Sequence, residues 1–351
     1  MFAALAQSGS DVAVKIATPS VAWKALAPVL ILIGGATLIL AVSAMTRRGA
    51  KSSLFAVTTV ITALAAMAAA VPLWREVTDP HKGAYTAIKG AITVDGFSVF
   101  FTFLVCAAVV LVALLADGYL RREGLDVAEL YVLMLLSASG GLIMAAANDL
   151  IVMFLGLEIL SIAAYVLAAM HLRRTESQEA GMKYFVLGAF SSAFFLYGIA
   201  LVYGSTGSTN LSRVVAFGRV TVTGANGLSY FLPTNHPSAL LLAGFALLLV
   251  GFGFKIAAVP FHSWTPDVYQ GSPTPVVAFM ASAVKAAGFA GLLRVFVVAF
   301  FDYSADWRPY LYALAVATML VGSVLAVVQT DVKRMLAYSS INHAGFILLG
   351  V

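Results

Sequence analysis

Long apolar runs separated by short polar segments dominate the sequence. A helix needs about 20 apolar residues to cross the hydrocarbon core of a bilayer. The chain lacks the alternating segments of about ten residues that are typical of a membrane barrel, so the pattern predicts helices. We predict about ten membrane-spanning helices, near residues 26–45, 54–73, 97–115, 128–147, 150–170, 182–203, 240–259, 275–300, 310–328 and 332–351.

The composition agrees with a chain whose outer surface faces lipid. Hydrophobic residues make up 61% and charged residues 11% of the 351 residues. A soluble domain contains about 45–50% apolar residues, because polar groups must cover its surface. Pattern and composition together predict an all-α integral membrane protein, a polytopic helical bundle. Because the last predicted span runs to Val351 without a polar flank, we expect the natural chain to continue.

Charge and cysteine content exclude several other classes of function. The formal charge of +5 does not indicate a nucleic-acid partner, because the basic residues lie in short clusters rather than on one face. Cys106 is the single cysteine, which excludes an internal disulfide, a cysteine-ligated iron–sulfur cluster and a cysteine-rich zinc site. The chain has no phosphate-binding loop and no His pair with metal-ligand spacing. We therefore expect no cofactor and no metal in this chain.

Short basic loops predict the orientation in the membrane. Loops of this kind are retained in the cytoplasm. Longer segments, 74–95 and 204–238, carry the more dispersed cations of the opposite side. This rule places the N-terminus outside and the paired cations inside, namely Arg47, Arg48, Lys51, Arg121, Arg122, Arg173, Arg174, Lys333 and Arg334.

One segment, PFHSWTPDVYQGSPTPV at 260–276, does not read as a continuous helix. Its four prolines remove backbone donors and interrupt helical hydrogen bonding. A broken helix at membrane depth marks ion or substrate sites in transporters. We therefore predict a broken helix around 255–275, although an ordinary extramembrane loop fits the spacing equally well.

Charged residues inside the predicted spans are candidates for function, because a charge at that depth costs several kcal/mol. Glu158 lies well inside the fifth span, and its short side chain cannot easily reach the surface. Lys285 lies roughly 15 Å of helix beyond Pro275, near the middle of the bilayer. Lys255 directly precedes the proline-rich segment. The structural alternatives are a protonated Glu158 that only bonds a neighbouring helix, and a Lys255 that extends to the surface.

Three further residues are weaker candidates. Lys183 lies close to the start of its span, where interface anchoring is an alternative to function. His262 and His343 are possible proton relays, because histidine titrates nearest neutral pH, but either also fits a polar group at a helix end. Asn148 and Asp149 are predicted helix caps without chemistry.

The buried acid and lysines suggest a physical design for moving protons. Burial disfavours the charged form of either group, whereas an opposite charge nearby favours it. If Glu158 and Lys255 are close, their pairing holds Lys255 protonated. Separation of the pair would then release the proton along the membrane plane toward Lys285. From the residues alone, this design predicts an ion-conducting membrane protein.

Three long segments resemble the antiporter-like subunits of respiratory complex I. They are NDLIVMFLGLEILSIAAYVLAA at 148–169, EAGMKYFVLGAFSSAFFLYGIALVYGSTGSTNL at 179–211 and FKIAAVPFHSWTPDVYQGSPTPVVAFMASAVKAAGFAGLLR at 254–294. Within this family, the sequence VPFHSWTPDVYQGSPTPV resembles the N-type subunits more closely than the L and M types, whose equivalent segments tend to have the sequence PLHTWLPDA. The resemblance covers about residues 127–351, whereas the first three spans match mainly in hydropathy.

The resemblance implies a role for each candidate. Glu158 matches the glutamate of the family's fifth helix, which pairs with a lysine, here Lys183 or Lys255. Lys255 falls on the broken seventh helix, Lys183 near the start of the sixth, and Lys285 matches the central lysine of the eighth. The family has two inverted five-helix repeats. The expected division is therefore 1–126 for helices 1–3, 127–300 for the first repeat and 301–351 for the start of the second, with the second-half exit residue beyond Val351.

The resemblance also implies an assembly and a chemistry. The expected function is a proton-translocating, non-redox subunit of a bacterial plasma-membrane NADH–quinone oxidoreductase. FMN, iron–sulfur clusters and quinone would be held by other subunits, and the neighbours would be M-, K-, J- and A-like membrane-arm subunits together with lipids. An Mrp-type cation/proton antiporter subunit is the alternative. A purely structural subunit is a third class, which the buried lysines disfavour.

Overall fold

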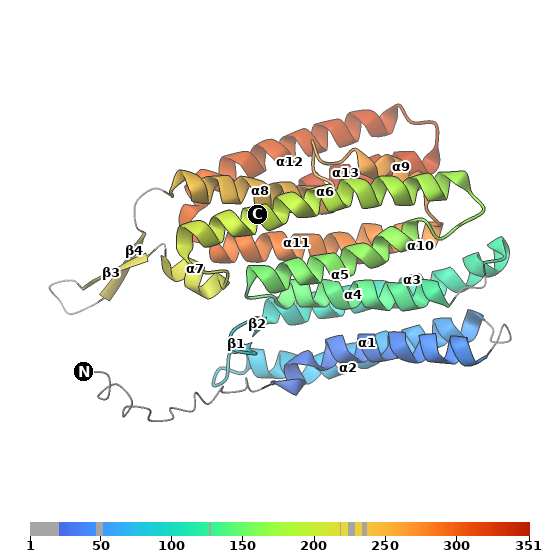
Figure 1. The fold of residues 1–351 in the computed structure, drawn as a ribbon, viewed down its shortest axis with the longest axis horizontal. Coiled ribbons are helices and arrows are strands. Elements are labelled where there is room, and N and C mark those ends of the chain that lie inside the picture. The colour runs from blue at the N-terminus through green and yellow to red at the C-terminus, as the bar shows by residue number, and fades with distance from the viewer. Residues whose placement is uncertain (1–20, 47–51, 126–127, 218, 224–228, 234–236) are drawn as a thin grey trace, which may run out of the picture.

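The computed structural model of the chain describes residues 21–46, 52–125, 128–217, 219–223, 229–233 and 237–351. Nine helical segments among these residues are long and apolar enough to cross a membrane. Figure 1 shows them side by side as a bundle. The nine are α1 (Trp23–Met45), α2 (Ser52–Thr78), α3 (Gly96–Glu123), α4 (Glu129–Ala146), α5 (Leu150–Ala168), α6 (Thr175–Thr206), α8 (Ala239–Ile256), the compound run Thr274–Ala299 and the run Phe301–Val327.

The predicted all-α membrane fold is confirmed. Each predicted span corresponds to a helical segment, and the tenth corresponds to α13 (Val332–Leu348), which has 17 residues. One clear difference is at the start of α6, which begins at Thr175 instead of residue 182. Its first turns are polar, so hydropathy alone did not include them. The predicted division into 1–126, 127–300 and 301–351 stays a prediction.

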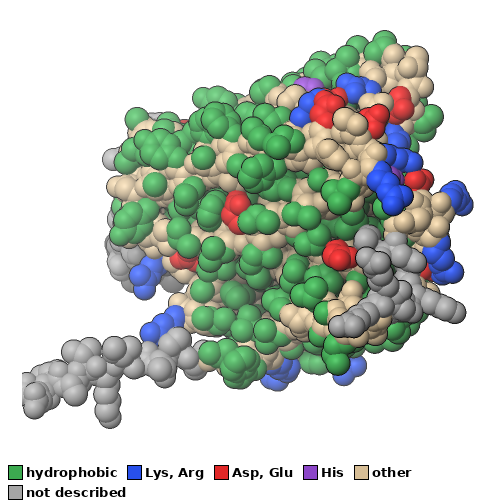
Figure 2. Space-filling model, turned by 45° about the vertical axis from the view of Figure 1, so that its right-hand side comes forward, with side chains coloured by type: hydrophobic (Ala, Val, Ile, Leu, Met, Phe, Trp, Pro, Cys, Tyr) green, Lys and Arg blue, Asp and Glu red, His purple; other side chains and the backbone are tan. Residues whose placement is uncertain are grey.

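The bundle has two chemically different ends. At one, called the hairpin end below, lie the antiparallel hairpins β1 (Tyr85–Ala87) with β2 (Ile92–Val94) and β3 (Arg219–Thr223) with β4 (Ser229–Pro233), together with α7 (Leu211–Phe217) (Figure 1). The opposite, basic end carries the loops with Arg121, Arg122, Arg173, Arg174, Lys333 and Arg334. Figure 2 shows Lys and Arg side chains gathered toward that end. The cations predicted at 47, 48 and 51 lie outside the described residues.

The predicted helix break is confirmed. Helix α8 ends at Ile256, Ala257 adopts a left-handed conformation with φ 61°, and the Val259–Pro260 peptide is cis. The chain resumes as α9 (Trp264–Gly271), breaks again at Ser272 and Pro273, and continues as α10 (Thr274–Phe279). Both ends of the broken segment pack into the bundle, because Ala257 is fully buried and Trp264 is 2% exposed. The Trp264 Nε1–H donates to the Phe254 carbonyl over 3.0 Å and so satisfies a backbone group at the end of α8.

The helix after α10 is not uniformly α-helical. Two π-helical stretches, η1 (Met280–Val284) and η2 (Arg294–Ala299), flank α11 (Lys285–Leu293). Single π turns inside helices are frequent at functional sites. Lys285 therefore lies directly after one irregular turn, and Arg294 begins the next. A 3₁₀ turn, η3 (Phe301–Tyr303), leads into α12 (Ser304–Val327).

Helices α4 and α5 pack with their backbones in close contact. A Cβ built on Gly156 would lie 2.8 Å from the Met144 nitrogen, and one built on Gly140 would lie 2.5 Å from the Leu160 nitrogen. The Ser137 hydroxyl donates to the Leu160 carbonyl over 2.8 Å, which fixes the two helices against each other. This contact positions the turn of α5 that carries the candidate acid, Glu158, between Gly156 and Leu160.

Candidate functional site

Lys255 lies in the last turn of α8 and is 2% exposed. Its Nζ donates a hydrogen bond to the Ser161 Oγ of α5 over 2.8 Å. The ammonium also lies 5.9 Å from the ring centroid of Tyr165 and 5.6 Å from that of Tyr184, within the range of cation–π attraction. The Lys255 headgroup therefore ends inside the bundle. The alternative of extension to the surface is wrong.

Glu158 lies on α5 one turn before Ser161. Its side chain is half-buried, and its Oε1 is buried without a hydrogen-bond partner among the described residues. Glu158 interacts electrostatically with Lys255, but no ion pair within 4.0 Å joins it to a lysine in the described part of the chain. The structure thus brings Glu158 and Lys255 near each other as separated charges rather than as a closed salt bridge.

Lys285 begins α11 and is 6% exposed. Its Nζ donates to the Ser340 carbonyl over 2.9 Å and to the Ser340 Oγ over 2.7 Å, both on α13. The ring of Tyr269, on α9, has its centroid 5.9 Å away. The elements that carry the two lysines touch, because a Cβ on Gly288 would lie 3.3 Å from the Lys255 Cγ. The predicted lateral arrangement of Lys255 beside the Lys285 helix therefore has a packing basis.

Lys183 has a different setting. Its side chain is 40% exposed, and its Nζ pairs with Asp267 Oδ2 and Glu179 Oε1, both at 2.6 Å. Arg334 donates to the other oxygen of Asp267 over 2.7 Å. Lys183 therefore joins α6 to α9 near the basic end, as an anchor. Of the two lysines that the resemblance offers as a partner for Glu158, the structure brings Lys255 close.

The remaining predicted residues have mixed outcomes. His262 is half-buried in the turn before α9, and its Nδ1 is buried with no partner among the described residues. His343 is exposed on α13, with its ring 6.2 Å from that of Phe346. Asp149 caps α5 as predicted, by accepting from the Ile151 nitrogen over 2.8 Å. The cap prediction for Asn148 is wrong, because its amide donates to the Gly90 carbonyl over 2.8 Å and ties two loops together.

Sequence reasoning missed the hydroxyl groups around the lysines. Ser161 and Ser340 accept from the two ammonium groups. Several other hydroxyls around the broken segment are buried without a hydrogen-bond partner among the described residues. Buried polar atoms of this kind are normally satisfied, in many cases by internal water. These oxygens are Tyr184 Oη, Thr265 Oγ1 and Ser272 Oγ. Isolated hydroxyls in apolar spans carry no signal in one sequence, so they were not predictable.

Comparison with known proteins gives matches to one family. The family described as "NADH:quinone oxidoreductase/Mrp antiporter, TM" matches residues 147–351. "NADH-quinone oxidoreductase subunit N" of Trichlorobacter lovleyi is 48% identical over 76% of this chain and 52% of that protein. The protein of the same name from Parafrankia sp. is 44% identical over 100% of this chain and 68% of its own length. The chain thus spans about half to two thirds of these curated relatives.

Comparison with solved structures also gives matches to membrane subunits of related complexes. A chain of respiratory complex I from Thermus thermophilus matches with TM-score 0.72 and 36% identity, over 92% of this chain and 63% of that one. A chain of the membrane-bound sulfane sulfur reductase, an archaeal respiratory membrane complex, matches with TM-score 0.74 and 27% identity, over 93% and 64%. A chain of the Mrp complex from Dietzia sp., with TM-score 0.71 and 21% identity over 94% of this chain and 59% of that one, shares the fold.

Proposed function

Because the chain belongs to the NADH:quinone oxidoreductase/Mrp antiporter transmembrane family, we propose that it acts in a proton-translocating membrane subunit of an NADH–quinone oxidoreductase. The relatives named subunit N support this assignment. The observation that carries it is the pair of buried lysines, Lys255 and Lys285, on two elements that touch. A buried lysine at membrane depth is costly, and a scaffold has no use for two.

The chemistry assigned to these residues is proton storage and transfer. An ionised Glu158 favours a protonated Lys255, because the two opposite charges attract across a medium of low dielectric. When Glu158 loses its charge or moves away, Lys255 holds its proton less tightly. The proton then passes toward Lys285 through the hydroxyl groups and internal water around α9. Ser161 and Ser340 orient the two ammonium groups for this exchange.

His262, in the turn of the broken helix, is a second relay position in this proposal, because its Nδ1 faces the interior unpaired. His343 and Lys183 receive no transfer step, since His343 is exposed and Lys183 is engaged by two carboxylates. The redox chemistry, with FMN, iron–sulfur clusters and quinone, belongs to other subunits. The neighbours in the assembly would be M-, K-, J- and A-like subunits. The basic end faces the cytoplasm and the N-terminus lies outside.

The Mrp-type alternative is favoured by one finding, since the family that matches residues 147–351 includes Mrp antiporter subunits. The two functions differ in the ion and in the energy source. Sodium-dependent exchange without NADH oxidation would favour the antiporter. Co-purification with flavin and iron–sulfur subunits would favour the oxidoreductase.

The test replaces Lys285 by methionine, which keeps the volume and removes the charge, in the native assembly. NADH oxidation and acidification of inside-out vesicles are measured together, after assembly has been verified on native gels. We expect both activities to fall by more than about tenfold, the loss typical of a positioned proton-transfer group. Lys24→Met is the matched control, because Lys24 is an exposed cation whose side chain is 54% accessible. Wild-type oxidation and pumping in Lys285→Met would refute the proposal.

A further inference from the structure

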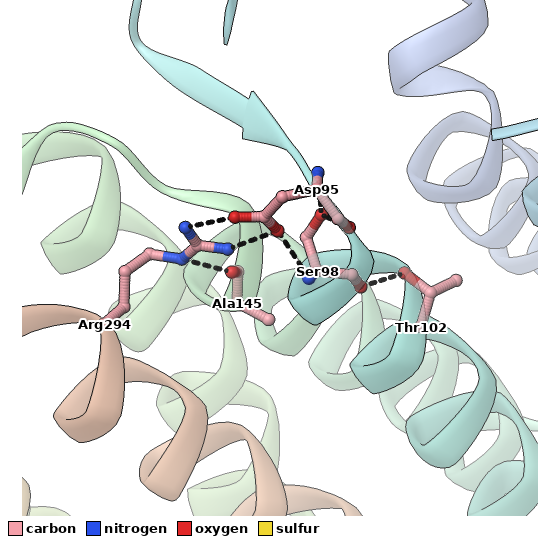
Figure 3. A network of polar contacts seen from close by, with 5 residues as sticks. All are labelled: Asp95, Ser98, Thr102, Ala145 and Arg294. Atoms are coloured by element: carbon pink, nitrogen blue, oxygen red, sulfur yellow. Dashed lines mark hydrogen bonds and ion pairs between the residues drawn. The ribbon is translucent and has the colours of Figure 1, made fainter. Parts of the chain in front are cut away.

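A buried arginine lies on the same helical run as Lys285, toward the hairpin end. Arg294 is 3% exposed, and its two terminal nitrogens each donate to one oxygen of Asp95 over 2.9 Å (Figure 3). Its Nε donates to the Ala145 carbonyl, near the end of α4, over 2.7 Å. The guanidinium lies 4.9 Å from the centroid of the Phe97 ring. A charge-assisted fork of this kind holds the guanidinium in one orientation.

Asp95 is itself held in place by the start of α3. It is the N-cap residue of that helix and accepts from the Ser98 nitrogen over 2.8 Å. Burial alone raises the pKa of the Asp95 carboxyl, but the Arg294 charge and the hydrogen bonds outweigh it and lower that pKa below its ordinary value of 3.8. The ion pair therefore persists at physiological pH.

A cavity at the hairpin end is lined by segments that lead to the ion pair. This cavity, of about 880 Å³, is lined by residues 85–91, by Asn148 and by residues of the loop before α7. The two segments that line it continue to the ion pair, because the Asn148 nitrogen donates to the Ala91 carbonyl and Ala147 bridges Ile92. Four residues beyond Ala91 the chain reaches Asp95, and three before Asn148 it reaches Ala145.

Apolar residues lie along the helical run between Lys285 and the ion pair. Arg294 and Lys285 are nine residues apart, or about 13 Å along a helix. Ala286 and Ala290, which lie between them, belong to an apolar cluster of residues from α3, α4 and α11. Its members are Phe97, Phe101, Ala145, Ala286 and Ala290. This cluster contrasts with the hydroxyl-lined surroundings of Lys285 on the side of α9.

We propose that Arg294, held by Asp95, is an electrostatic barrier that stops protons from passing between Lys285 and the hairpin-end cavity. This inference rests on the proposed function. Arginine keeps its proton at every physiological pH, so Arg294 neither accepts nor releases one, and its guanidinium repels hydronium locally although Asp95 makes the pair neutral overall. Fixed arginine charges exclude protons from membrane pores in this way, and dry apolar constrictions add to the effect. The barrier leaves lateral transfer as the route for a proton on Lys285.

The test measures passive proton leak in liposomes that contain the native assembly with the full-length chain. A pH gradient is imposed without NADH, the membrane potential is clamped, and an internal dye reports the decay. The double variant Arg294→Gln with Asp95→Asn removes both charges and leaves no unpaired ion. We expect its leak to rise severalfold. The rise stays below the order of tenfold that one uncompensated unit charge over about 10 Å at an effective dielectric of about 20 would give, because Asp95 offsets part of the Arg294 field.

Three variants separate a charge barrier from a packing role. Arg294→Lys and Asp95→Asn both break the bidentate pair but keep a cation, so we expect neither to leak more than wild type. Arg308→Gln, which removes an exposed cation on α12, should also leave the leak unchanged. Equal leaks in Arg294→Lys, Asp95→Asn and the double variant would overturn the barrier in favour of simple packing.

A further variant tests the route. Adding Lys285→Met to the leaky double variant should restore a tight membrane, and a persistent leak would overturn the assigned path. Pumping by Lys285→Met alone tests the proposed function separately. A tight double variant beside a Lys285→Met variant that does not pump would overturn the barrier and leave the proposed function standing.

Discussion

The close contact between α4 and α5 predicts that Gly156→Ala destabilises the protein. A Cβ at this position would lie 2.8 Å from the Met144 nitrogen and 2.9 Å from the Gly140 carbonyl oxygen. Ordinary Cβ contacts begin near 3.4 Å. The two helices must therefore separate by about 0.6 Å, the difference between 3.4 Å and 2.8 Å. Because the three nearest neighbours are backbone atoms, no side-chain rotation can relieve the contact.

Two opposing contributions set the size of the effect. Overpacking of a tight interior costs about 1–3 kcal/mol. Replacing glycine by alanine inside a helix stabilises the folded state by up to about 1 kcal/mol, because alanine has the higher helix propensity. We therefore expect a net loss of about 1–2 kcal/mol. The separation would also stretch the Ser137–Leu160 hydrogen bond and displace Glu158 and Ser161, so pumping should fall together with stability.

Gly118→Ala in α3 is the matched control, because nothing lies within 4 Å of a Cβ at that position. It gains the propensity and has no contact to relieve, so it should be as stable as wild type or up to about 1 kcal/mol more stable. Thermal unfolding can be followed with a thiol-reactive dye, since Cys106 is fully buried and reacts only when the bundle opens. If both alanine variants melt at the same temperature, the backbone contact does not limit the packing of α4 on α5.

Three further outcomes can be measured. Lys183→Met should keep most of the pumping activity and lose at most about 1 kcal/mol of stability, whereas Lys255→Met should stop proton pumping in vesicles. Trp264→Phe removes the hydrogen bond to the Phe254 carbonyl and should lower stability by about 1 kcal/mol in the thiol assay. The lowered pKa of Asp95 contributes stability above about pH 4, which is lost as pH falls through the folded-state pKa. The difference in melting temperature between wild type and Asp95→Asn should therefore shrink in acid below pH 4.

The spans were predictable because bilayer thickness imposes a length and a composition on each helix. The helix break was predictable from prolines, Lys285 from its distance to any polar flank, and Lys255 from its position directly before the break. The β-hairpins were not predictable, because a strand as short as Tyr85–Ala87 is too short to show an alternating hydrophobic pattern. The role of Lys183 was ambiguous, because hydropathy did not show where its helix begins. Helix α6 starts at Thr175 with polar turns, and Lys183 lies near this polar start with a partly exposed side chain.

The partners of the lysines were beyond prediction, because they come from distant parts of the chain. Ser161 is 94 residues from Lys255, and Ser340 is 55 residues from Lys285. A single sequence does not say which hydroxyl of a facing helix meets an ammonium group. Arg294 was missed for a different reason. It lies near the predicted end of its span, where an arginine normally extends to the surface, whereas Asp95 holds it inside.

The two lysines are held by different helices, and this separation matters for how transfer can be controlled. Lys255 is bonded to α5 through Ser161, whereas Lys285 is bonded to α13 through Ser340. The first turn of α13 also binds the end of α9, because the Lys333 ammonium donates to the carbonyl of Ser272, the C-cap residue of α9, over 2.8 Å. A movement of α13 would therefore change the hydrogen bonds of Lys285 and the position of α9 together, and leave the bond of Lys255 to α5 in place. In the proposed mechanism, the proton affinity of Lys285 can then be changed without first disturbing Lys255, as one-way transfer between the two lysines would require.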